Sequence, residues 1–137
     1  MVRPEVIRRR LQKLDEYLTI LHSLREYNRD AFLSDPERYG SAERFPQLAI
    51  ESTLDAGSHI IAQLHLGSVD SYRDIPEILS QHSCVDEELR ERWIRMIGFG
   101  NVFVHEYVDL DRDIVYEALQ NDLDDIVAVR STLAQFL

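Results

Sequence analysis

One stretch of the sequence, residues 98–107, gathers the side chains best suited to chemistry. It reads Gly-Phe-Gly-Asn-Val-Phe-Val-His-Glu-Tyr, so Asn101, His105 and Tyr107 fall within seven residues among apolar neighbours. Because an imidazole can be charged or neutral near pH 7, His105 can donate or accept a proton in hydroxyl chemistry. Asn101 adds amide donors, and Tyr107 adds a hydroxyl. From spacing alone, however, the plainer interpretation is favoured, in which these side chains close a helix end by hydrogen bonds.

Two glycines, Gly98 and Gly100, precede these polar residues in a segment with a helical period. A glycine inside a helix costs about 1 kcal/mol relative to alanine. We therefore expect the pair to allow another backbone or a ligand to approach closely.

Other chemical constellations are absent from the sequence. There is no Gly-rich phosphate loop with its lysine, and no Glu-x-x-His pair repeats on two helices as in a di-iron bundle. Cys84 is the one cysteine, which excludes an internal disulfide and a Cys-rich zinc site. We predict neither a metal nor a cofactor, and we expect His59 and His65 to be ordinary residues of the bundle.

Apolar residues recur every three or four positions along most of the chain, which predicts amphipathic helices. The first helix begins near Pro4, and Ser34 to Glu37 ends one helix and starts the next, with Asp35 as N-cap. The second helix is predicted to reach about Leu66 and close on Gly67, with a kink or a short turn near Pro46. The expected inward residues of these two helices are Ile7, Leu11, Leu14, Leu18, Leu21, Leu24, Leu48, Ile50, Leu54, Ile61 and Leu64.

A short helix is predicted around residues 75–79, ending near His82, and two long helices follow it. The first has Asp86 as N-cap and the second begins near Asp113. Their expected buried residues are Leu89, Trp93, Met96, Ile97, Phe103 or Val104, Ile114, Ala118, Leu119, Leu123, Ile126, Val129 and Leu133. No segment alternates with a period of two. We therefore predict an all-α antiparallel bundle of four long helices and one short helix, forming a single domain over residues 1–137.

Composition limits the possible functions further. The 137 residues carry a formal net charge of −10, so a broad basic surface for nucleic acid is disfavoured and any such site needs locally concentrated basic groups. All but one of the fifteen basic residues are arginine, which suits bidentate contacts with anions. We find no signal peptide and no apolar run of transmembrane length, and we expect a cytoplasmic protein without membrane contact.

The chain as a whole resembles the HepT family of HEPN-domain toxins, which are paired with a minimal nucleotidyltransferase (MNT) antitoxin. The likeness is strongest in residues 43–51, in Ser71-Tyr72-Arg73-Asp74 and in residues 101–111. The last block matches the family signature of Arg, four to six residues, His, any residue and Tyr.

The resemblance implies a HEPN bundle that forms a homodimer, with two motif copies facing one another across a cleft. It implies metal-independent RNA cleavage, on a substrate such as tRNA or mRNA, with His105 as acid or base. It also implies a cognate MNT antitoxin that silences the toxin by transferring AMP to Tyr107. Negative charge and bulk at Tyr107 would then repel RNA phosphates.

The sequence departs from the signature at Gly100, where the family has its arginine. A glycine supplies no cation for the phosphate, and loss of one such donor typically costs about 10²–10³ in rate. Three explanations are open: a change selected to remove toxicity, a natural member that has lost activity, or another arginine in its place, such as Arg44 or one from the partner subunit. Arg95 lies ten residues before His105, or about 15 Å along a helix, so it is not expected to take the place of the missing arginine within one subunit.

Two other function classes compete with a ribonuclease. The first is a non-catalytic helical module that binds the nucleotidyltransferase and is modified by it, which Gly100 favours. The second, more distant, is a small-molecule or nucleotide-binding helical protein. Glu43, Arg44 and Glu51 are expected to form a solvated helix face, and Tyr72 to pack its loop against the bundle.

Overall fold

A computed structural model describes residues 3–105 and 112–137 of this chain, with side chains described outside residues 99–105. The described part is helical throughout its regular elements, and no strand occurs in it. The helices are α1 (Pro4–Arg25), α2 (Arg29–Leu33), α3 (Pro36–Gln63), α4 (Asp74–Gln81), α5 (Glu87–His105) and α6 (Arg112–Leu133), followed by the 3₁₀ turn η1 (Ala134–Phe136).

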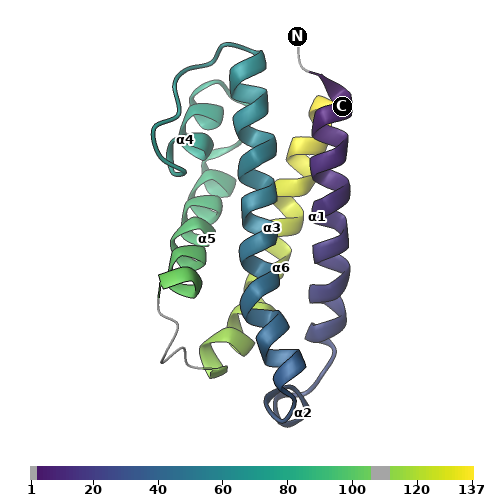
Figure 1. Ribbon diagram of the computed structural model, residues 1–137. Coiled ribbons are helices and arrows are strands. Elements are labelled where there is room, and N and C mark those ends of the chain that lie inside the picture. Colours follow the sequence, from purple (N-terminus) through teal and green to yellow (C-terminus); the bar gives the residue numbers. More distant parts are fainter. Residues whose placement is uncertain (1–2, 106–111) are drawn as a thin grey trace.

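The four long helices, α1, α3, α5 and α6, form an antiparallel bundle with α3 at its centre (Figure 1). Helix α3 contacts α1, α4, α5 and α6, and α6 also contacts α1 and α5. Both ends of the chain lie at one end of the bundle, and the short α2 lies at the other (Figure 1). The predicted all-α bundle with four long helices is therefore confirmed.

The predicted apolar stripes form the core. All six leucine and isoleucine positions expected on α1 are buried, as are the four expected in the first half of α5. The helix starts were also predicted correctly. Asp35 accepts a hydrogen bond from the Glu37 N–H at 2.9 Å, and Asp86 accepts one from the Leu89 N–H at 2.7 Å.

The structure has two short helices where one was predicted. Helix α1 ends at Arg25, and the chain then turns into the additional helix α2 before reaching Asp35. The side chain of Asn28 caps α2 by accepting a hydrogen bond from the Ala31 N–H at 2.8 Å. This N-cap was the available sequence signal, because asparagine is among the preferred residues at such a position.

Helix α3 differs from the prediction in its middle and at its end. It continues through Pro46 without an intervening turn. It ends at Gln63, and His65, with φ of +54°, occupies the left-handed position that was assigned to Gly67. The His65 N–H donates to the Ala62 carbonyl at 3.4 Å, and the Leu66 N–H donates to the Ile61 carbonyl at 3.0 Å. These are the two bonds of a Schellman motif, so the helix closes two residues earlier than glycine preference suggested.

Three expected packing residues are solvent-exposed instead. Leu64 is 37% exposed because α3 has already ended, and Ile114 is 46% exposed because Val115 takes the inward position on α6. Tyr72 is 58% exposed, so it does not pack its loop against the bundle. The loop is held by Asp74, whose carboxylate accepts the backbone N–H groups of Asp70 and Ser71 at 2.9 and 3.0 Å.

A tight junction joins α3, α4 and α5. The indole N–H of Trp93 donates to Thr53 Oγ1 at 3.1 Å, and the Thr53 hydroxyl donates to the Ile50 carbonyl at 2.6 Å. Both side chains are fully buried, so the bond satisfies polar atoms that water cannot reach. A Cβ added at Gly57 would lie 2.7 Å from Ile75 Cγ2 and 3.1 Å from the Trp93 ring. Glycine is therefore what allows the three helices to approach this closely.

Across residues 3–105 and 112–137, no helix combines the length and the apolar character needed to cross a membrane.

Candidate active site

The helix α5 carries three of the four predicted site residues. Gly100, Asn101 and His105 lie in its last turns, and α5 ends at His105. Their side chains are not among those described, and Tyr107 lies outside the described residues altogether. The roles assigned to these four positions therefore remain predictions, and the described geometry is that of the surrounding helices.

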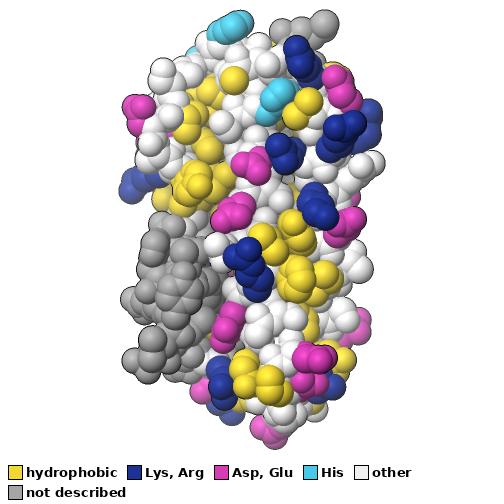
Figure 2. Space-filling view, viewed as in Figure 1, with side chains coloured by type: hydrophobic (Ala, Val, Ile, Leu, Met, Phe, Trp, Pro, Cys, Tyr) yellow, Lys and Arg dark blue, Asp and Glu magenta, His cyan; other side chains and the backbone are white. Residues whose placement is uncertain are grey.

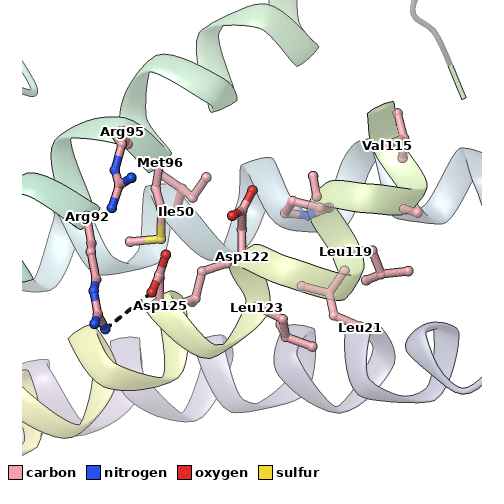
Figure 3. Close-up of a pocket in the computed structure, with 14 residues that line it drawn as sticks. Leu21, Ile50, Arg92, Arg95, Met96, Val115, Leu119, Asp122, Leu123 and Asp125 are labelled. Carbon is pink, nitrogen blue, oxygen red and sulfur yellow. Dashed lines mark ion pairs between the residues drawn. The ribbon is translucent and has the colours of Figure 1, made fainter. Parts of the chain in front are cut away.

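A pocket of about 280 Å³ lies between α5 and α6, with α1 and α3 forming its floor (Figure 3). The pocket residues on α5 lie one to two helical turns before the motif. Those on α6 begin at Val115, about one turn after α6 starts at Arg112. The pocket thus lies beside both helices that flank the segment connecting α5 to α6. Its apolar wall is formed by Leu21, Ala42, Pro46, Ile50, Met96, Val115, Ala118, Leu119, Leu123 and Ile126.

Two arginines of α5 and two aspartates of α6 add charge to this apolar pocket. Arg92 forms an ion pair with Asp125 at 3.4 Å, drawn in Figure 3, and a second one with Glu88 within its own helix. Arg95 is exposed and forms no ion pair with the described carboxylates. It therefore presents a guanidinium that is available to an anion at the surface side of the pocket.

Asp122 faces this arginine pair from α6. Partial burial raises the pKa of the Asp122 carboxyl, the nearby Asp125 raises it further, and the charge of Arg95 opposes both effects. A carboxyl with a raised pKa in a pocket is a common feature of functional sites, although ion-pair networks produce it as well. The arrangement can hold a mostly apolar group together with a charged one.

The sequence did not identify this charged set, although a signal for it exists. Arg92 and Arg95 are three residues apart, as are Asp122 and Asp125, so each pair lies on one side of its helix. Only the antiparallel packing of α5 on α6 places one pair opposite the other.

Most other candidate residues have the plainer role that was favoured for them. On α3, Arg44 donates to Gln47 at 3.0 Å and Gln47 donates to Glu51 at 3.2 Å, which is a solvated helix face. Arg44 does not line the pocket. His59 is half-buried in the bundle, and its Nε2 lacks a hydrogen-bond partner among the described residues.

Gly98 does not serve a close approach within the described part of this chain. A Cβ added there would meet no atom within 4 Å, in contrast to Gly57. The expected close approach therefore has no counterpart inside the described bundle.

Among the described residues, no three His, Cys, Asp or Glu side chains come together in a way that could hold a metal ion. The thiol of Cys84 is half-buried, and burial raises its pKa, which makes it a poor nucleophile.

The family of this chain follows from a match that extends over nearly its whole length. The family described as "Ribonuclease HepT-like" matches residues 7–133, from the first turn of α1 to the last residue of α6. This chain belongs to the HepT-like ribonuclease family. The family was therefore recognised correctly from the sequence.

Two curated relatives bear the same family name. The chain is 34% identical over 79 residues to the mRNA nuclease HepT of Shewanella oneidensis, an alignment covering 58% of this chain and 59% of that protein. It is 29% identical over 120 residues to the tRNA nuclease HepT of Aphanizomenon flos-aquae, covering 86% of this chain and 80% of that protein. The chain thus matches less than two thirds of the length of the first HepT relative.

The fold is also that of a solved HEPN toxin. The tri-AMPylated HEPN toxin of Shewanella oneidensis, solved in complex with its MNT antitoxin, aligns with a TM-score of 0.85 at 24% identity. The alignment covers 95% of this chain and 97% of that chain, which shows that the two share the complete HEPN bundle.

Proposed function

We propose that this chain is the toxin of a toxin–antitoxin pair and acts on RNA as an endonuclease. The family match across residues 7–133 carries the proposal, because it includes the helix that bears Asn101 and His105. The Shewanella oneidensis and Aphanizomenon flos-aquae relatives, named as mRNA and tRNA nucleases, support RNA as the substrate class.

The reaction needs no metal in this proposal. The ribose 2′-oxygen attacks the adjacent phosphorus, and the bond from phosphorus to the 5′-oxygen of the next nucleotide breaks. The proton of the 2′-hydroxyl leaves to a general base, and the departing 5′-oxygen receives a proton. His105 serves as one of these acid–base groups, since its imidazole exchanges protons near pH 7. The products are a 2′,3′-cyclic phosphate and a 5′-hydroxyl.

Gly100 removes the cation that the family signature places beside the phosphate. Along α5, the available guanidinium of Arg95 is ten residues from His105, or about 15 Å of helix axis. Arg95 can therefore hold a phosphate elsewhere on the RNA but does not replace the missing group within one subunit. We infer that the chain binds RNA and cleaves it slowly, unless a homodimer brings an arginine of the partner subunit to His105.

Regulation is proposed to act on Tyr107. The solved relative is an AMPylated toxin in complex with its antitoxin, which supports AMP transfer by a cognate MNT nucleotidyltransferase here as well. An AMP group adds negative charge beside the motif, and this charge repels RNA phosphates.

The experiment that tests the nuclease compares four proteins on end-labelled RNA in a buffer with chelator. They are the unmodified chain, His105→Ala, Gly100→Arg and Gly100→Arg/His105→Ala. We expect Gly100→Arg to raise the cleavage rate by about 10²–10³, and His105→Ala to abolish the gain. If all four are equally inert while remaining folded dimers, the catalytic proposal is wrong.

The second candidate function is a non-catalytic module that binds the nucleotidyltransferase, and Gly100 is the observation that favours it. Incubation with the cognate nucleotidyltransferase and ATP, followed by mass spectrometry, tests the modification. AMP on Tyr107, absent from Tyr107→Phe, is expected from both candidates. Cleavage by Gly100→Arg then separates a disarmed nuclease from a module that never cut RNA.

A further inference from the structure

The arginines of this protein differ in their contacts. Most arginines that follow the first turns of α1 interact with a described partner. Arg25 forms an ion pair with Asp124, Arg73 with Glu77, and Arg130 with Asp15. The arginines at the N-terminal end of α1 form no ion pair with any described carboxylate. This group consists of Arg3, Arg8, Arg9 and Arg10, and we call it, together with Lys13, the α1 collar.

The α1 collar concentrates positive charge on an acidic protein. Residues 3–13 contain five basic side chains and one acidic one, Glu5, and therefore carry +4. Since the whole chain carries −10, the rest of it carries −14. This is the local concentration of basic groups that an acidic chain needs to bind a polyanion.

Every side chain of the collar is exposed, and their directions cover the solvent side of α1. Arg8, Arg9 and Arg10 are consecutive, so they point about 100° apart around the helix. Figure 2 shows dark blue side chains gathered over the upper, N-terminal half of α1. Lys13 is the partly engaged member, because it pairs with Glu16 at 3.1 Å.

The collar lacks the features of a lipid-binding helix. An amphipathic helix binds a membrane by inserting an apolar face, but the apolar face of α1 is already buried in the bundle. Ile7, Leu11 and Leu14 are each at most 2% exposed. What remains for a partner is a set of guanidinium groups, which bind phosphate through paired, charge-assisted hydrogen bonds.

We propose that the α1 collar binds the phosphate backbone of the RNA substrate, away from the cleavage motif. This inference rests on the proposed function, which makes RNA the polyanion concerned. The collar lies at the end of the bundle where α1 begins, and α5 runs away from that end toward His105 (Figure 1). A bound RNA therefore extends along the bundle and is held at two separated places, with the collar supplying much of the salt-dependent affinity.

The test measures RNA binding in the His105→Ala background, so that cleavage does not interfere. Arg9→Gln/Arg10→Gln removes two collar charges. The control, Arg25→Gln/Arg73→Gln, removes two charges that already pair with Asp124 and Glu77. Affinity for a single-stranded RNA is measured between about 50 and 200 mM salt, the range over which the affinity due to phosphate contacts falls steeply.

We expect the collar variant to bind roughly tenfold more weakly at the lowest salt. Its negative slope of log affinity against log salt should become shallower by about 1 to 2. The control should change both quantities much less. Arg9→Lys/Arg10→Lys should restore the slope, because lysine keeps the charge. The melting temperatures of the collar variants should agree closely with that of the His105→Ala protein, since no ion pair to a described residue is removed at Arg9 or Arg10.

Three kinds of result would overturn the proposal, and they are distinguishable. If the His105→Ala protein binds RNA but the collar variant and the control bind it equally well, the collar is not an RNA site, and the proposed function is unaffected. If the His105→Ala protein binds no RNA at all, the proposed function fails together with the collar. The third is a collar variant that still binds RNA but no longer binds the nucleotidyltransferase, or no longer binds vesicles of anionic phosphatidylserine. Either finding would assign the surface to another partner.

Discussion

Two sides of α5 are packed in opposite ways. At Trp93, the helix is pressed against α3 and α4, with Gly57 making room for the ring and Thr53 satisfying its N–H. One turn later, at Met96, the same helix borders a pocket of about 280 Å³. The comparison indicates that α5 is tightly packed on the side that carries Trp93, while the side that carries Arg92, Arg95 and Met96 borders the pocket.

The largest effect should come from removing the Trp93 ring. Trp93→Ala is expected to lower the free energy of unfolding by about 3–5 kcal/mol, because it leaves a large cavity and removes the hydrogen bond that the indole donates to Thr53. Met96→Ala is the matched control, and it should cost about 2 kcal/mol, since Met96 already borders empty space. Urea denaturation measures both. Equal losses would mean that the two sides of α5 are equally well packed.

A smaller effect should come from adding one methyl group on each side of the comparison. Gly57→Ala forces a Cβ against Ile75 and Trp93 and should cost about 1–3 kcal/mol. Gly98→Ala adds its Cβ in open space on a helix and should stabilise by up to about 1 kcal/mol. Thermal denaturation followed by circular dichroism gives the sign of each change. A stabilising Gly57→Ala would show that the junction is looser than described.

The smallest effect concerns the charge in the pocket. Because the pKa of Asp122 is raised on folding, the folded state holds its proton more tightly, and deprotonation weakens the fold. Asp122→Asn should therefore be slightly more stable than the unmodified chain at neutral pH. The advantage should disappear as the pH falls through the raised pKa toward the ordinary aspartate value of about 4.

Asp74→Asn provides a control of opposite sign. Backbone N–H groups of Asp70 and Ser71 lower the pKa of Asp74, so its stabilising contribution is present above the ordinary aspartate range and is lost as the pH falls through the lowered value. Melting temperatures between pH 3 and pH 7 compare the two variants, with the range set by the ordinary aspartate pKa of about 4. If both variants follow the same pH trend, the burial of Asp122 does not control its proton affinity.

The motif illustrates how far a single sequence reaches. The residues around His105 were one of three blocks by which the whole chain resembled its family, because a pattern of residue types at fixed spacing is a property of the sequence itself. The same pattern placed three of the four site residues in α5, where the structure has them. The geometry of their side chains depends on neighbours that a local pattern does not specify.

Local chemistry determined the helices and most of their starts. Asp35 and Asp86 cap helices because a short carboxylate satisfies free N–H groups nearby in the sequence, and the α1 stripe is buried because its spacing matches the helical turn. Only the tertiary structure decided which helix faces meet. It placed Gly57 under Trp93, set Arg92 opposite Asp125 and left the arginines of the α1 collar without an ion pair to any described carboxylate. Contacts between residues far apart in the sequence depend on how whole helices pack, and no periodicity within one helix specifies its neighbour.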